Sequence, residues 1–75
     1  MLNYYETVKK YYDKGYYSKL DVAVFVKAEK ITREEFKEIT GEEYVEVLKQ
    51  AVKDGAITKE KYYELTGEEY VEVEE

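Results

Sequence analysis

An internal repeat constrains the fold of this chain more than any other feature. Residues 31–47 read ITREEFKEITGEEYVEV, and residues 57–73 read ITKEKYYELTGEEYVEV, the same phrase 26 residues later. A repeat of this length is one supersecondary unit, which cannot bury its apolar face without packing on a neighbour. At 75 residues, the chain is close to the smallest size that a single hydrophobic core can stabilise. We therefore expect one helical domain, with an N-terminal helical hairpin over residues 1–30 and repeat copies at 31–56 and 57–75, the second truncated.

Both copies carry sequence signals for the start of a helix. A Thr followed three residues later by Glu is typical of a capping box, in which the two side chains accept hydrogen bonds from each other's backbone amides. This pattern occurs at Thr32, Thr40 and Thr66, whereas Thr58 is followed by Lys61 in place of the acid. Apolar residues flank each Thr at the spacing of a hydrophobic staple. These signals predict short helices that meet at sharp turns.

The periodicity of the apolar residues predicts an all-α fold of about five short helices, arranged as helical hairpins. With Asn3 and Ser18 as further caps and Gly15 as a stop signal, we expect helices over about 4–14, 19–28, 33–39, 41–54 and 59–65. The second of these is apolar almost all round, which is typical of a helix buried on several sides. A short β-strand over residues 22–26 is the alternative.

The acidic C-terminal tail begins at Gly67 and copies the start of the fourth predicted helix. Acidic side chains suit the N-terminus of a helix but oppose the dipole at its C-terminus. We therefore expect this tail to be only partly helical, over at most two turns.

The composition argues against several classes of function. The chain has no Cys and no His, so it lacks the residues of disulfides, thiolate metal sites and the commonest acid–base chemistry. Its formal net charge of −6 opposes binding to nucleic acid. It has neither an apolar run long enough to cross a bilayer nor the pattern of a signal peptide. We expect no enzyme activity, no cofactor and no small-molecule, nucleic-acid or membrane partner.

Paired acids offer one alternative, a site for a hard cation. The pairs are Glu34–Glu35, Glu42–Glu43 and Glu68–Glu69. A calcium loop needs oxygen ligands at alternating positions around a glycine, and the chain has no such loop. Placement at helix N-termini explains the pairs more simply.

A DNA-binding helix-turn-helix is the second alternative, because short helices joined by tight turns resemble that motif. The basic residues available to a recognition helix are Arg33, Lys37, Lys59 and Lys61, and each has glutamates close by in the sequence. This composition disfavours the motif.

Tyrosine is the residue most suggestive of function. The chain has ten tyrosines, two phenylalanines and no tryptophan, so tyrosine must fill much of the core. Several occur as adjacent pairs, and neighbouring side chains on a helix point roughly 100° apart, so that one ring of a pair enters the core while the other stays near solvent. Exposed tyrosines are typical of protein interfaces. The candidate partner-binding residues are Tyr5, Tyr11, Tyr16, Tyr17, Tyr63 and Tyr70.

The chain resembles the XkdX-like family of small phage proteins. The resemblance rests on the tyrosine-rich start, on Lys14-Gly15-Tyr16-Tyr17-Ser18, on Phe25-Val26-Lys27-Ala28, and on the stretch from Ile31 to Tyr44. It covers residues 1–44, and residues 52–70 repeat its C-terminal half. Two departures are the second copy itself and Glu29, which stands where a glycine is common.

This resemblance implies a setting and supplies no catalytic residues, because members are encoded in tail and baseplate regions of phages and prophages of Gram-positive bacteria. It implies a structural or accessory tail protein that contacts a tail, baseplate or tail-fibre protein. Residues 48–65 are also similar to short C-terminal helical hairpins that serve oligomerisation, which adds self-association as an option. The alternatives are an assembly chaperone that does not stay in the particle and a small acidic regulatory binder. The expected location is the virion or tail-like particle, or the host cytoplasm during assembly.

Overall fold

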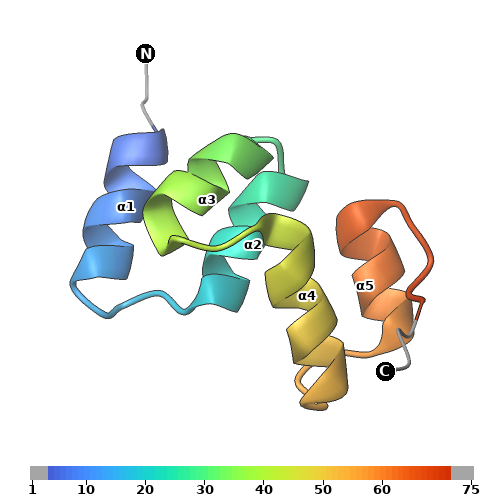
Figure 1. The fold of residues 1–75 in the computed structure, drawn as a ribbon. Coiled ribbons are helices and arrows are strands. Elements are labelled where there is room, and N and C mark those ends of the chain that lie inside the picture. The colour runs from blue at the N-terminus through green and yellow to red at the C-terminus, as the bar shows by residue number, and fades with distance from the viewer. Residues whose placement is uncertain (1–3, 72–75) are drawn as a thin grey trace.

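The computed structural model describes residues 4–71, which form five α-helices joined by short turns (Figure 1). The helices are α1 (Tyr4–Asp13), α2 (Lys19–Lys27), α3 (Arg33–Thr40), α4 (Tyr44–Lys53) and α5 (Lys59–Thr66). These residues contain no strand, so the all-α prediction is confirmed and the strand alternative for residues 22–26 is wrong. The largest difference in the helix bounds is at α4, which begins at Tyr44 and not at residue 41.

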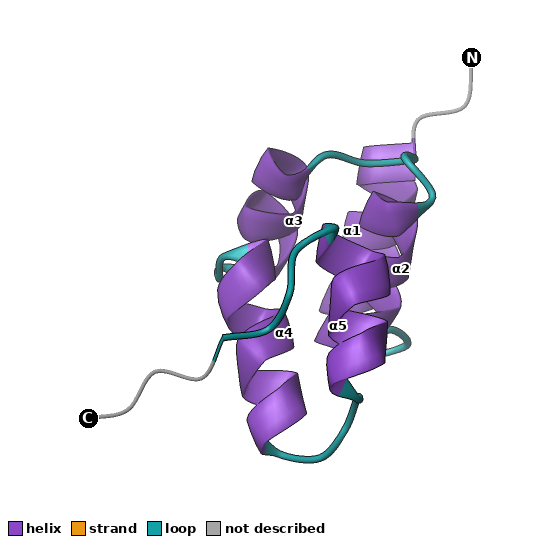
Figure 2. Ribbon diagram, turned by 90° about the vertical axis from the view of Figure 1, so that its right-hand side faces the viewer, coloured by secondary structure: helices purple, strands orange, loops and turns teal. Residues whose placement is uncertain are grey.

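Helix α2 is central to the packing, because it contacts each of the other four helices. The molecule is elongated, 42 × 22 × 17 Å, with α1 at one end and the α4–α5 hairpin at the other (Figures 1 and 2). Val22 and Ala23 of α2 are completely buried, whereas Val24 is 55% exposed. Burying a valine side chain contributes roughly 1.5–3 kcal/mol. The predicted burial of this helix on several sides is confirmed, and Val24 is the exception.

Tyrosine fills much of the core, as the composition predicts. Tyr44 and Tyr62 are the two largest fully buried side chains. The hydroxyl of Tyr44 donates a hydrogen bond to the carbonyl oxygen of Leu65, 2.5 Å away, so its burial leaves no unpaired polar group. The cluster of buried residues comprises Val8, Val22, Ala23, Ile31, Phe36, Ile39, Tyr44, Val47, Leu48, Tyr62 and Leu65.

The turns α1–α2, α2–α3 and α4–α5 share one construction. Each contains a residue with left-handed backbone, namely Gly15 (φ 86°), Glu29 (φ 62°) and Gly55 (φ 80°). In the second turn, the amide of Lys30 donates to the carbonyl of Phe25 over 2.9 Å, and the same bond recurs in the other two. This is the Schellman motif, which satisfies carbonyls at the end of a helix. A glutamate thus occupies a conformation that favours glycine.

The predicted caps at Ser18 and Thr32 both form reciprocal capping boxes. The hydroxyl of Thr32 accepts from the amide of Glu35 at 3.0 Å, and the Glu35 carboxylate accepts from the amide of Thr32 at 2.9 Å. Thr58 caps α5 with its hydroxyl alone. The predicted cap at Asn3 lies outside the described residues.

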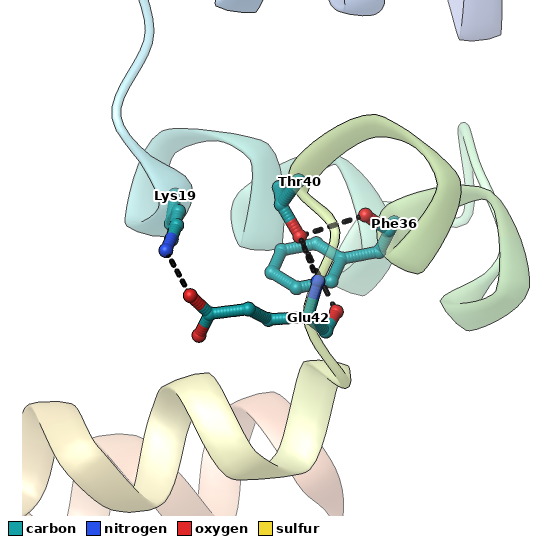
Figure 3. A network of polar contacts seen from close by, with 4 residues as sticks. All are labelled: Lys19, Phe36, Thr40 and Glu42. Carbon is teal, nitrogen blue, oxygen red and sulfur yellow. Dashed lines mark hydrogen bonds and ion pairs between the residues drawn. The ribbon is translucent and has the colours of Figure 1, made fainter.

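The helix starts predicted at Thr40 and Thr66 are wrong, because each Thr is the last residue of a helix. Gly41 follows Thr40 in the left-handed conformation (φ 82°) and ends α3. The Thr40 hydroxyl donates to the carbonyl of Phe36 at 2.9 Å and accepts from the amide of Glu42 at 3.2 Å (Figure 3). Threonine hydroxyls bond to nearby backbone at either end of a helix, so the Thr-Gly-Glu-Glu phrase closes one helix and does not cap the next.

The acids of this phrase pair with lysines instead. Glu42 forms an ion pair with Lys19 at the start of α2 (Figure 3), and Glu43 lies 3.0 Å from Lys37. The N-terminus of α4, at Glu43, has no side-chain cap. The first of these contacts joins the α3–α4 turn to α2.

The described part of the C-terminal tail differs from its predicted, partly helical state. Residues 67–71 contain no helix, and residues 72–75 lie outside the described part of the chain. Gly67 has left-handed backbone (φ 76°) and ends α5, as Gly41 ends α3. In the first copy the next helix starts at Tyr44, which corresponds to Tyr70.

Candidate protein-contact surfaces

The structure separates the candidate tyrosines into two groups and one isolated position. One group lies at the α1–α2 turn, the other lies on α5 and the segment after it, and Tyr5 lies between α1 and α3. Of the adjacent pairs, Tyr62–Tyr63 follows the predicted division most clearly, with Tyr62 1% exposed and Tyr63 53% exposed. Tyr4–Tyr5 does not, because both rings are half-buried.

The N-terminal aromatic cluster consists of Tyr11, Tyr16 and Tyr17. The ring of Tyr11 lies 5.9 Å from that of Tyr16 and 5.7 Å from that of Tyr17. Tyr17 also contacts the half-buried ring of Phe25 at 5.5 Å, which anchors the cluster to the core. Tyr16 is 69% exposed. Because aromatic rings have large apolar faces, an exposed cluster of this kind can bury considerable area against a partner.

The second surface is the α5 groove, an open hollow of about 720 Å³. Its lining residues are Lys59, Glu60, Tyr63, Glu64, Glu69 and Tyr70. It therefore joins the two C-terminal candidate tyrosines to a charged rim that the sequence interpretation missed. The signal was present in the repeat, since Lys59 and Tyr70 align with Arg33 and Tyr44.

Tyr5 is engaged within the molecule. Hydrogen bonding to the Glu38 carboxylate of α3, followed by burial, raises the pKa of the Tyr5 phenol. The contact links α1 to α3, which pack against each other. Tyr5 belongs to neither exposed group, and its part in partner binding stays a prediction, as it does for the other candidate tyrosines.

A polar joint connects the two repeat copies. The guanidinium of Arg33 lies 5.0 Å from the centre of the Tyr44 ring and donates to the carbonyl of Thr66 over 3.0 Å. Tyr44 donates to the neighbouring carbonyl of Leu65. Both carbonyls belong to the last turn of α5, where backbone acceptors lack partners within the helix. Residues from the start of α3 and of α4 thus cap the end of α5.

The second copy reproduces the donor side of this joint. Phe36 and Tyr44 have ring centres 5.3 Å apart at 84°, and the equivalent pair, Tyr62 and Tyr70, has 5.4 Å and 83°. Lys59, the equivalent of Arg33, places its ammonium 5.9 Å from the Tyr70 ring centre. Within residues 4–71, however, no helix end is bonded to Lys59 or Tyr70.

Burial affects the phenols in the core. Burial raises the pKa of Tyr44, and the charge of Arg33 opposes this effect. Burial also raises the pKa of Tyr62, and the negative charge of Glu68 adds to the shift. Both phenols are held in the neutral form, in which Tyr44 donates its hydrogen bond.

The described residues contain no group of three or more side chains that could hold a metal ion. Three of the six acids considered as cation ligands are engaged elsewhere: Glu42 and Glu43 pair with lysines, and Glu35 completes a capping box. None of the helices in this part of the chain has the length and apolar character needed to cross a membrane.

Comparison with known proteins identifies a family. The sequence matches the family described as phage uncharacterised protein (Phage_XkdX) over residues 5–44, and again over residues 45–70. No curated protein and no solved structure is detectably similar to the chain. The second matched segment corresponds to the α4–α5 hairpin, so the repeat duplicates part of the family's own pattern. Since the two segments together cover most of the chain, the protein belongs to this phage family.

Proposed function

We propose that the protein is a non-enzymatic structural or accessory component of a phage tail or baseplate, or of a prophage-derived tail-like particle. It acts by contacts with other proteins of the particle. Membership of a phage family supports the phage setting. The tail or baseplate role comes from the genomic setting implied by the XkdX-like resemblance.

The observation that carries the contact-making role is the exposure of two tyrosine-bearing surfaces in so small a domain. Tyr16 is 69% exposed and Tyr63 is 53% exposed. The first lies in the N-terminal aromatic cluster at the α1–α2 turn, and the second lines the α5 groove. Tyrosine is enriched at protein–protein interfaces. Two such surfaces on different helices suit a component that touches more than one neighbour.

Mass spectrometry of purified phage or tail-like particles from a producing strain tests the location. The proposal expects the 9.0 kDa chain in fixed stoichiometry with the tail proteins. Its absence from particles, when it is abundant in the lysate, would contradict the proposal and support the assembly-chaperone alternative.

Substitution of the exposed tyrosines tests the mode of action. Tyr16→Ala and Tyr63→Ala should each lower incorporation into particles without unfolding the chain, because neither side chain is buried. Val24→Ala is the matched control, since Val24 is an exposed apolar side chain (55%) on another helix. Equal incorporation of all three variants would show that contact does not depend on these tyrosines.

A further inference from the structure

The α5 groove repeats the donor half of the polar joint, but within residues 4–71 only the donors of the first repeat copy are bonded to the end of a helix. In that copy, Arg33 and Tyr44 donate to the carbonyls of Thr66 and Leu65. We propose that Lys59 and Tyr70 form a docking site for the C-terminal end of a helix in a partner protein, presented by a hairpin like α4–α5.

The first step of the argument is that the donor geometry is already built. The ring pair Tyr62–Tyr70 matches Phe36–Tyr44 within 0.1 Å in separation, at 5.4 and 5.3 Å, and within one degree in tilt, at 83° and 84°. A basic side chain approaches the Tyr70 ring, as one approaches the Tyr44 ring. The Tyr70 side chain is thus held in place by the buried Tyr62 before any partner arrives. Such preorganisation lowers the cost of binding.

The second step is that the turn leading to Tyr44 at the end of α3 is repeated at the end of α5, where it leads to Tyr70. The hydroxyl of Thr66 donates to the carbonyl of Tyr62 at 2.9 Å, as that of Thr40 donates to the carbonyl of Phe36 at the same distance. The amide of Gly67 donates to Tyr63 at 2.7 Å, which matches the bond from Gly41. The backbone that carries Tyr70 therefore follows the same path as the backbone that carries Tyr44.

The third step concerns the chemistry of the occupant. The last carbonyls of a helix lack intrahelical donors and form the negative end of its dipole. A phenol and an ammonium supply the donors that such a helix end needs, as the phenol and guanidinium do for α5. Glu60, Glu64 and Glu69 line the same groove, and their charges disfavour a free phosphate or other full anion beside Lys59.

Adding a helix end to the existing chain tests the site. Duplicating residues 45–70 directly after Tyr70 supplies an α4–α5 hairpin at high effective concentration. We expect the added hairpin to become helical, measured by circular dichroism, and to unfold in one transition with the rest. If it stays unfolded, the proposal is wrong.

Tyr70→Phe separates docking from a general structural effect. It should reduce the equilibrium constant for folding about tenfold in the duplicated chain, the effect of removing one partner of a buried hydrogen bond. In the natural chain the same change should have less than about a twofold effect. Tyr44→Phe in the natural chain supplies the reference, since its hydroxyl bonds to Leu65. Equal, small effects of Tyr70→Phe in both chains would overturn the proposal.

Sedimentation of the natural chain tests the choice of occupant. A monomer at all concentrations agrees with a partner of another sequence, whereas a dimer abolished by Tyr70→Phe would assign the site to a second copy and overturn that choice. The docking site names a class of partner for the proposed function, and the biological setting of this inference rests on that function. Mass spectrometry of particles tests the proposed function alone, and the duplicated chain tests the docking site alone. Either proposal can therefore fail without the other.

Discussion

Glu29 and Gly55 occupy the same position in two copies of one turn, and both have left-handed backbone, with φ of 62° and 80°. Among the non-glycine residues of the described range 4–71, Glu29 alone has a positive φ. Side chains with a Cβ pay about 1–2 kcal/mol in this conformation. The α2–α3 turn is therefore strained where its counterpart is relaxed.

Glu29→Gly should stabilise the protein by about 0.5–1 kcal/mol, since relief of the strain exceeds the entropy that glycine adds to the unfolded chain. Denaturant unfolding followed by circular dichroism measures the change. Gly55→Ala is the control and should destabilise. A Cβ at Gly55 would meet no atom within 4 Å, so its cost isolates the backbone conformation. A loss of stability in Glu29→Gly would show that the glutamate makes a compensating contact.

Tyr44→Phe should destabilise the protein by about 1–2 kcal/mol, because the carbonyl of Leu65 loses its donor in a buried place. The ring, and with it the contact with Phe36, is retained. Tyr63→Phe removes a hydroxyl from a side chain that is 53% exposed and should change stability by less than about 0.5 kcal/mol. Equal effects of the two substitutions in urea unfolding would contradict the polar joint as a source of stability.

Removal of residues 45–75 should abolish cooperative unfolding. The truncated chain loses α4 and α5, both of which pack on α2, and it exposes the buried faces of Val22 and Tyr44. Thermal circular dichroism of residues 1–44 is the measurement. A sharp transition at an unchanged temperature would mean that the second copy is an appendage and that the single-domain prediction is wrong.

Stability should fall at alkaline pH. The pKa of Tyr44 is raised above its ordinary value of 10.0 by burial, so the folded protein binds this proton more tightly than the unfolded chain does. The resulting stabilisation is complete below pH 10 and disappears as the pH rises through the raised pKa. Tyr62 contributes in the same direction. Chemical denaturation at several pH values between 9 and about 12 measures the slope.

The comparison for this pH dependence is Tyr44→Phe, which lacks the titrating group and should show a shallower decline. The other groups whose pKa values are raised account for the remaining slope, namely Tyr5, Tyr62, Lys9 and Lys19. Identical slopes in the two proteins would exclude Tyr44 as a contributor.

The sequence predicted the features that depend on neighbouring residues. The caps at Ser18 and Thr32 follow from side chains three residues apart, and the repeat and helical periodicity predict the number of helices. The sequence pattern predicts the wrong helix end for Thr40, because the signals of a closing turn and an opening cap use the same residue types. The deciding factor was Gly41, whose left-handed backbone ends α3.

The candidate site was predicted in part. The exposure of Tyr63 follows from the alternation of adjacent rings around a helix, whereas Tyr16 is exposed because it lies in the turn between α1 and α2. The bond from Arg33 to Thr66 spans 33 residues of sequence, and no local pattern encodes a tertiary contact of that kind. Consequently the sequence alone does not predict the polar joint or the repetition of its donor half at Lys59.

The joint at Tyr44 also affects the order in which the chain becomes fixed during synthesis. Translation runs from the N-terminus to the C-terminus, so Arg33 and Tyr44 are synthesised before the carbonyls they bind. At about 5–20 residues per second, translation of the missing hairpin takes on the order of seconds, whereas small helical proteins fold in about microseconds to milliseconds. The joint therefore forms only after α5 has been synthesised, and a chain that terminates before α5 lacks the contacts that join its two repeat copies.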